Sequence, residues 1–298
     1  GMNYKIKKEI ISMKLTRQTT INVFVSMLLV GGLLGCSSSE ERQAKYLDKA
    51  QAQYDNGNYE KAELEVKNVL QINTNNAQAR YLWALVQEKS QLWRQMFGNL
   101  QTAVDMDPQF VAARIKLSQL LYKSGDMDAV VQHVQTVLEL EPDNADGHAL
   151  LGSVMLRRGD TAGAEVEAQK ALAQVPGHVG AVSILSGIYK SQDPDRALAV
   201  IEDSIQSQPR DATLKLLKIG ILKEQDNVDG VIHEYQELIA EYPENMFIHY
   251  RLVKFYEAQD RIDEAEELLR GVIKAQPDKL PLKLWLANFL ANQRNLKT

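Results

Sequence analysis

The chain has 298 residues, of which 45% are apolar and 24% charged, and its formal net charge is −5. This composition is that of a folded protein and excludes a disordered or collagen-like chain. The mild acidity argues against nucleic acid as a partner, because phosphate binding needs a basic face. A single cysteine excludes an intramolecular disulfide.

Residues 1–35 have the pattern of a secretory signal peptide. A lysine-rich flank precedes an apolar run from Ile21 to Gly35. A run of about 15 residues is too short to span a hydrocarbon core about 30 Å thick as a helix. Gly1 ahead of Met2 is typical of a residue left after removal of an expression tag. Translation from Met13 instead would give a compact signal peptide.

The apolar run ends in Leu33-Leu34-Gly35-Cys36, which resembles the lipobox of bacterial lipoproteins. The resemblance implies that Cys36 carries a diacyl anchor after cleavage, and two acyl chains bind a membrane stably where one is marginal. By resemblance to the Gram-negative sorting pattern, Ser37 implies the periplasmic face of the outer membrane. Residues 36–42 would then be the lipidated cysteine and a polar tether. The alternative is a chance cysteine after an ordinary signal peptide.

Two series of residues downstream share a period of 34, with a single step of 33. One series is proline, at Pro108, Pro142, Pro176, Pro209, Pro243 and Pro277. The other is small or apolar, at Ala62, Met96, Val130, Ala164, Ala197, Val231 and Ala265. A fixed period of this length predicts a stacked array of two-helix units. We expect seven units at residues 43–76, 77–110, 111–144, 145–178, 179–211, 212–245 and 246–279.

Each unit has two apolar stripes at helical spacing, separated by a turn and closed by proline. This pattern resembles the tetratricopeptide repeat family, which implies an all-α, right-handed solenoid of stacked antiparallel two-helix repeats. The turn glycine of the family is present as Gly57, Gly125 and Gly159, and is replaced by Gln91, Asp193, Asp226 and Asp260. The family also has an aromatic residue near the start of the first helix of each repeat. In this chain it is present only as Tyr46, and the other units have Arg80, Arg114, His148, Val182, Lys215 and His249 at this position.

Residues 280–298 predict the first helix of an eighth unit. This helix is very apolar, and no second helix follows to cover it. Because the ends of a solenoid need polar caps, we expect that the natural protein continues beyond Thr298, or that a partner or a second copy covers the helix.

No constellation of residues predicts catalysis, a metal site or a cofactor. The five histidines do not form a His-Glu-x-x-His pair, and no phosphate loop, dinucleotide fingerprint or nucleophile elbow occurs. The acidic cluster at Glu264, Glu266 and Glu267 predicts a solvated helix face. His148 and His249 share one repeat position, which indicates wall structure rather than a ligand pair. We therefore expect a protein that is not an enzyme.

The resemblance places the first helices on a concave groove that binds a partner. It implies these groove residues: Gln51, Tyr54, Tyr81, Glu88, Lys89, Gln119, Tyr122, Lys123, Arg157, Lys190, Lys223, Tyr250 and Lys254. The three tyrosines of the N-terminal half predict an aromatic strip, and the cations from Lys89 to Lys223 predict a cationic ladder. The alternatives are packing between repeats for the tyrosines, and compensation of the helix dipole for the cations.

Three functions remain open from the sequence. The first is a membrane-anchored scaffold that binds another envelope protein or an extended peptide. The second is a component of an exopolysaccharide export system that binds an anionic polysaccharide. The third is the repeat arm of a larger protein with its active domain beyond residue 298. The chain is similar to tetratricopeptide lipoproteins of exopolysaccharide or exosortase-type loci.

Overall fold

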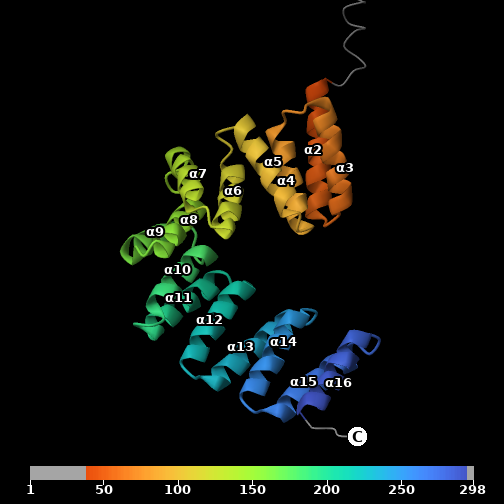
Figure 1. Ribbon diagram of the computed structural model, residues 1–298, viewed down its shortest axis with the longest axis vertical. Helices are drawn as coiled ribbons and strands as arrows, with labels where there is room; N and C mark the ends of the chain where they lie inside the picture. The colour runs from red at the N-terminus through yellow and green to blue at the C-terminus, as the bar shows by residue number, and fades with distance from the viewer. Residues whose placement is uncertain (1–37, 294–298) are drawn as a thin grey trace, which may run out of the picture. The chain divides into compact units, whose positions relative to one another are not determined.

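A computed structural model describes residues 38–293, and the chain is helical throughout this range (Figure 1). No strand occurs among these residues, so the predicted all-α class is confirmed. The helices are α2 Ser39–Asp55, α3 Tyr59–Ile72, α4 Ala77–Lys89, α5 Trp93–Met106, α6 Val111–Ser124, α7 Met127–Leu140, α8 Ala145–Arg157, α9 Thr161–Gln174, α10 Val179–Tyr189, α11 Pro194–Ser207, α12 Ala212–Glu224, α13 Val228–Glu241, α14 Met246–Ala258, α15 Ile262–Ala275 and α16 Leu280–Gln293.

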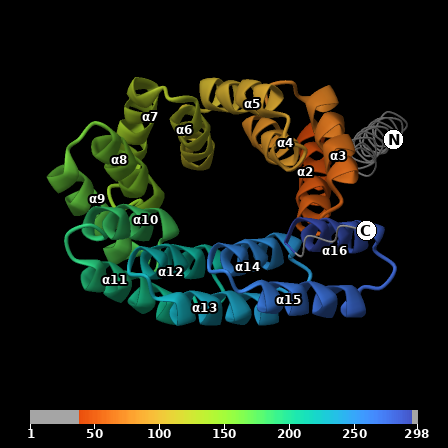
Figure 2. The same cartoon turned by 60° about the horizontal axis from the view of Figure 1, so that its bottom comes forward.

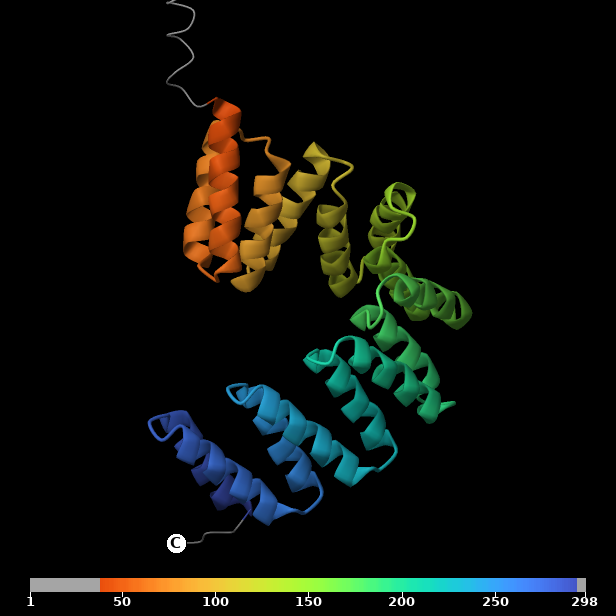
Figure 3. The same cartoon turned by 180° about the vertical axis from the view of Figure 1, so that it is seen from behind.

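Consecutive helices are joined by short turns (Figure 3). Within each part of the chain, neighbouring helix pairs pack on one another, as α3 does on α4, α9 on α10, α11 on α12 and α13 on α14. The packed pairs are α2–α3, α4–α5, α8–α9, α10–α11, α12–α13 and α14–α15, and α16 packs on α15 as a further single helix. This is the predicted solenoid of two-helix repeats.

The chain divides into two compact units, residues 1–113 and 114–298, with the boundary in the first turn of α6. In the first unit, α2 packs on α3, α3 on α4, and α4 on α5. The core that joins them contains Ala50, Val66, Val69, Ala79 and Leu82, all buried. Most of the stabilising apolar burial in this unit therefore comes from contacts between neighbouring helices.

The second unit has its helices in two rows. The first helices α10, α12 and α14 form one row, and the second helices α11, α13 and α15 form the other (Figure 2). One core cluster surrounds Leu185, Ile201 and Leu214. Another surrounds Tyr235 and Leu252, and includes Phe289 of α16.

The turns inside the repeats need a left-handed backbone even where glycine is absent. Gln91, Asp226 and Asp260 have φ of 57°, 53° and 56°, in the same region as Gly57 at 75°. The left-handed conformation costs a residue with a Cβ about 1–2 kcal/mol. The residue after Gln91 compensates by donating its amide hydrogen to the carbonyl of Gln87 at 2.9 Å, as in a Schellman motif. After Asp226, the Asn227 amide donates in the same way to the Leu222 carbonyl at 2.9 Å. After Asp260, the Arg261 amide donates to the Tyr256 carbonyl, also at 2.9 Å.

Asp193 does not take the role of the turn glycine that the alignment of repeats predicts. Its φ is −148°, and its side chain accepts a hydrogen bond from the amide of Arg196 at 3.0 Å as the N-cap of α11. The repeat that contains Asp193 is the one with the 33-residue step, so the turn loses its left-handed residue and the cap follows directly.

The N-terminal segment requires a second correction. Helix α2 begins at Ser39, inside the segment predicted as a polar tether up to residue 42. Ser38 starts it with a capping box, because its hydroxyl accepts from the Glu41 amide at 3.0 Å and its own amide donates to Glu41 at 3.1 Å. The predicted signal peptide and Cys36 lie outside the described residues. Within residues 38–293, no helix combines the length and apolar character needed to cross a bilayer.

Candidate functional site

A hollow of about 450 Å³ lies over the C-terminal end of α12 and the face of α14. It brings together three of the predicted groove residues, Lys223, Tyr250 and Lys254. The remaining lining residues are Tyr235, Arg251, Phe255, Ala258 and Gln259. The lining thus combines three cations with three aromatic rings and contains no carboxylate.

Aromatic rings hold the cations of this hollow in place. The Nζ atom of Lys223 lies 5.2 Å from the ring centre of Tyr235 and 5.0 Å from that of Phe255. It also donates a hydrogen bond to the Tyr235 hydroxyl at 3.2 Å. The guanidinium of Arg251 lies 4.6 Å from the ring centre of Phe247. Rings attract cations through their negative faces without neutralising the charge, so the hollow stays positive.

Lys254 is the exception, because a carboxylate partly neutralises it. Its Nζ atom lies 2.6 Å from Glu257 Oε2. The hydrogen bond to Glu257 raises the pKa of Lys254 above its ordinary value. The net positive charge offered to a ligand therefore comes mainly from Lys223 and Arg251.

Exposed aromatic side chains border the hollow. Tyr250 is 47% exposed and Phe247 is 53% exposed. The ring of Tyr250 lies 5.8 Å from that of Trp285 on α16. Sequence analysis missed Arg251 and Trp285. The spacing of Phe247 and Arg251 by one helical turn was the available signal for the arginine.

The predicted groove residues of the first unit form a separate cluster. The rings of Tyr54 and Tyr59 lie 5.6 Å apart, and the Nζ atom of Lys89 lies 6.0 Å from the Tyr54 ring centre. Tyr81 packs on Phe110 at 5.0 Å. Burial raises the pKa of both Tyr54 and Tyr81, and the Glu88 carboxylate adds to the rise.

Two cations of the predicted cationic ladder, Arg157 and Lys190, contact a neighbouring repeat. Arg157 lies 4.8 Å from the ring centre of Tyr122 and donates to the Tyr122 carbonyl at 3.2 Å. Lys190 forms an ion pair of 2.9 Å with Glu224, one repeat further along. These contacts favour a role in joining repeats over a free anion-binding row.

The other predicted groove residues vary in their surroundings. Gln51 donates to Asp55 at 2.8 Å within α2. Gln119 is half-buried on α6, and Lys123 is exposed at its end. The structure does not gather these three residues into the hollow described above.

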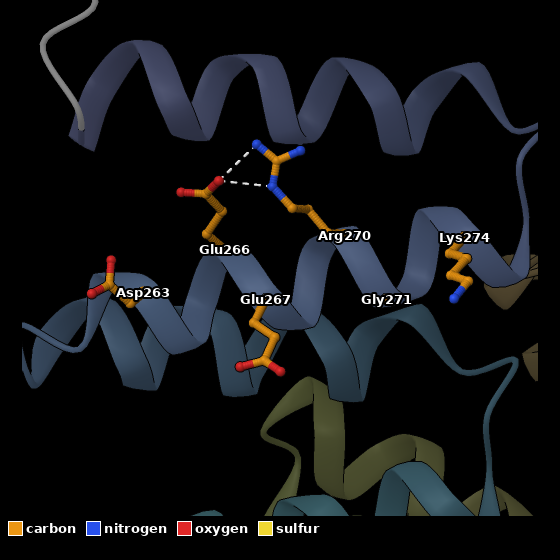
Figure 4. A pocket seen from close by; sticks show the side chains of 6 residues that line it. All are labelled: Asp263, Glu266, Glu267, Arg270, Gly271 and Lys274. Atoms are coloured by element: carbon orange, nitrogen blue, oxygen red, sulfur yellow. Dashed lines mark hydrogen bonds and ion pairs between the residues drawn. The ribbon is translucent and has the colours of Figure 1, made fainter.

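A second hollow lies on the surface of α15 and is lined by Asp263, Glu266, Glu267, Arg270, Gly271 and Lys274 (Figure 4). Glu266 and Arg270 are one turn apart, and their ion pair measures 2.7 Å. All six residues lie on one face of α15. Of the predicted acidic cluster, Glu266 and Glu267 line this hollow, whereas Glu264 is half-buried and forms an ion pair with Arg261 at 2.7 Å. Among residues 38–293, no group of acidic, histidine and cysteine side chains could hold a metal ion.

Two histidines at the same repeat position have different partners. His148 on α8 lies 2.6 Å from the Glu167 carboxylate through Nδ1 and 2.8 Å from the Pro142 carbonyl through Nε2. His249 on α14 is also buried, and its hydrogen bond within residues 38–293 goes to the backbone carbonyl of Asn245 at 3.1 Å. Leu268 occupies the place in α15 that Glu167 occupies in α9.

The His148–Glu167 contact is one of three polar pairs with the same spacing of 19 residues. The others join Arg80 to Asn99 at 3.2 Å and Arg114 to His133 at 3.0 Å. Each pair links the first helix of a repeat to the second. In these three repeats, the position of the family's early aromatic residue therefore holds one end of a polar contact across the helix pair.

Comparisons with known proteins identify the repeats. A family model described as tetratricopeptide repeat matches residues 98–154 and 222–287, and a second of the same description matches residues 131–179. The chain is 25% identical over 164 residues to "Cellulose synthase operon protein C" of Xanthomonas axonopodis pv. citri, covering 52% of this chain and 11% of that protein. It is 25% identical over 186 residues to human "Protein O-mannosyl-transferase TMTC1", covering 61% and 21%. The chain therefore spans only a small part of these relatives.

Solved structures share the fold. The pilF protein of Pseudomonas aeruginosa superimposes with a TM-score of 0.57 at 18% identity, covering 76% of this chain and 100% of that one. PilW, described as a type IV pilus biogenesis factor, gives a TM-score of 0.58 at 15% identity, covering 70% and 98%. At these identities the likeness establishes the repeat architecture alone.

Proposed function

Because this chain carries tetratricopeptide repeats, we propose that it is a scaffold that binds an acidic, extended segment of an envelope protein in the hollow over α12 and α14. The observation that carries the proposal is the lining of that hollow: Lys223 and Arg251 beside exposed rings, without a carboxylate among the lining residues. An acidic segment would gain charge-assisted contacts there, and its apolar side chains would cover Tyr250 and Phe247.

The experiment compares two synthetic peptides of ten residues. One alternates glutamate and leucine, and the other alternates lysine and leucine. Fluorescence anisotropy should show saturable binding of the acidic peptide, weakened roughly tenfold by Arg251→Glu. Lys223→Met, which keeps the packing on Tyr235 and removes the charge, should weaken it less.

Lys274→Glu is the matched control, because it makes the same change of charge on the exposed surface of α15. It should leave the affinity for the acidic peptide unchanged. Equal binding of both peptides, or an equal effect of Arg251→Glu and Lys274→Glu, would contradict the proposal.

We further propose that Cys36 carries a lipid that holds the scaffold at the periplasmic face of the outer membrane. The lipobox-like Leu33-Leu34-Gly35-Cys36 sequence supports this. Cells fed labelled palmitate should incorporate the label into the protein, and Cys36→Ser should lose both the label and sedimentation with outer membranes. Retention of the label by Cys36→Ser would overturn the anchor.

A second candidate function is polysaccharide binding in an exopolysaccharide system. It is favoured by the exposed rings of Tyr250 and Phe247 and the half-buried ring of Trp285 beside Tyr250, which suit stacking on sugars, and by the relative named for a cellulose synthase operon. Cello-oligosaccharides and an anionic glycan such as alginate would serve as probes in affinity electrophoresis. Retardation by either, abolished by Tyr250→Ala, would support this function, whereas unretarded migration would exclude it for these glycans.

A further inference from the structure

A separate groove of about 760 Å³ runs between the second helices α13 and α15, with α14 as its floor. Figure 2 shows α13 and α15 following one another in the outer row of this unit. The groove lies on the opposite side of α14 from the hollow over α12, so it does not depend on the function proposed above. Its volume is within the usual range for a ligand-binding cleft, about 300–1,000 Å³.

The groove has apolar walls and an apolar floor. Ile239 of α13 faces it from one wall, and Leu268 of α15 from the other, each half-buried. Leu252 and Tyr256 of α14 form the floor. A ligand that enters the groove must therefore present apolar side chains to gain from burial.

The charged rim of the groove is acidic. Glu244 and Glu267 are exposed lining residues, and within residues 38–293 neither forms an ion pair. The third acid, Glu264, is compensated by Arg261 at 2.7 Å. The uncompensated charge on the rim is therefore negative, which favours a basic ligand.

One buried acceptor at the groove also lacks a donor. The side chain of Gln276 lines the groove, and its buried Oε1 atom accepts no hydrogen bond in the described part of the chain. A buried acceptor without a partner costs about 1–3 kcal/mol, so a ligand that donates a hydrogen bond here recovers part of this cost.

We propose that this groove docks one basic amphipathic helix of a protein partner. A helix satisfies its own backbone hydrogen bonds, whereas an extended peptide would leave amide groups facing the apolar walls. Apolar side chains spaced by three and four residues would enter between α13 and α15. Flanking lysines or arginines would reach Glu244 and Glu267, and one such donor would reach Gln276.

The test uses a synthetic 14-residue helical peptide with leucines on one face and lysines on the flanks. A matched peptide carries glutamate in place of lysine. In fluorescence anisotropy with the full chain, the lysine peptide should bind saturably with one copy per chain. In the Arg251→Glu chain, where the cationic hollow over α12 is weakened, the glutamate peptide should bind roughly tenfold more weakly than the lysine peptide, because two ion pairs are replaced by repulsion.

Gly271→Phe locates the binding site. A Cβ at Gly271 meets nothing within 4 Å, so phenylalanine can occupy the groove without strain in α15. This variant should lose most of the affinity for the lysine peptide. Gly98→Phe is the control, because Gly98 is an equally open position on α5, which is also the second helix of its repeat and lies in residues 1–113.

The double charge reversal Glu244→Lys with Glu267→Lys gives a second readout that does not require filling the groove. It should reverse the preference between the two peptides while circular dichroism stays unchanged. Unaltered binding of the lysine peptide to both the Gly271→Phe and the charge-reversed chains would overturn the proposal, as would equal binding of both peptides to the Arg251→Glu chain. Arg251→Glu should not weaken the lysine peptide, which separates this site from the hollow over α12.

Discussion

The helix pairs α8–α9 and α14–α15 have the same lengths and the same register, yet their interiors differ. In α8–α9, His148 forms a buried contact with Glu167 across the pair. In α14–α15, Leu268 stands at the place of Glu167, and the hydrogen bond of His249 within residues 38–293 goes to a backbone carbonyl. The comparison shows that one repeat position can form a buried polar contact between two helices in one repeat and line a groove in another.

The two helix pairs also differ in the size of the side chains between their helices. Gly152, Ala164 and Ala168 lie between α8 and α9, which pack closely. The matching places in α14–α15 hold Val253, Ala265 and Leu269. Small residues allow close approach of helix backbones, and larger ones hold the helices apart.

The largest effect is expected from removing the His148–Glu167 contact between α8 and α9. His148→Ala should lower the free energy of unfolding by about 3 kcal/mol, because it leaves the Glu167 carboxylate buried with Lys170 as its remaining partner. His249→Ala should cost only about 1 kcal/mol, the contribution of one hydrogen bond. Urea denaturation, together with hydrogen exchange of α8 and α9, measures both variants. Equal losses would show that the two histidines play the same part.

A second test makes α8 resemble α14. Gly152→Val should destabilise the chain by about 1–3 kcal/mol through overpacking. A Cβ there would lie 3.2 Å from the Ala164 carbonyl oxygen, which belongs to the backbone and cannot move aside easily. Gly187→Ala is the control, because its Cβ meets nothing within 4 Å, and it should stabilise α10 by roughly 0.5–1 kcal/mol. Thermal unfolding followed by circular dichroism measures both changes.

The third prediction concerns pH. Burial acts to raise the pKa of Glu167, but hydrogen bonds from Lys170 and His148 outweigh it and hold the pKa below its ordinary value. A carboxylate whose folded pKa is lowered contributes stability above its unfolded pKa and loses it as the pH falls through the folded pKa. Stability should therefore decline below about pH 4, and Glu167→Gln should flatten this decline. Urea midpoints between neutral and acidic pH would show it, and an unchanged slope in Glu167→Gln would contradict it.

The smallest effect is expected at the surface. Lys190→Ala removes an ion pair with Glu224 whose side chains are 45% and 51% exposed. Solvent screens such a pair, so the loss should be about 0.5 kcal/mol or less and should shrink further at high salt. A loss as large as that of His148→Ala would mean that the cations between repeats, rather than the polar contacts inside them, hold the array together.

The periodic features of the sequence were enough to predict the helix pairs. Prolines and small residues act locally, ending helices or allowing close contact, so their spacing reports the repeat directly. The start of α2 was missed because the Ser38–Glu41 capping box lies before the first recognisable repeat. Asp193 was misassigned because its repeat is one residue shorter and has no left-handed turn residue.

The sequence by itself determined the two-helix repeat, its register and the equivalence of His148 with His249. Only the tertiary structure decided what those positions do, because partners such as Glu167 and Leu268 lie across a helix pair and differ between repeats. It likewise gathered Lys223, Arg251 and Tyr250 into one hollow and engaged Arg157 and Lys190 with neighbouring repeats. The spacing of residues along the sequence determines on which helix face a side chain lies, whereas packing between helices determines which groups that side chain contacts.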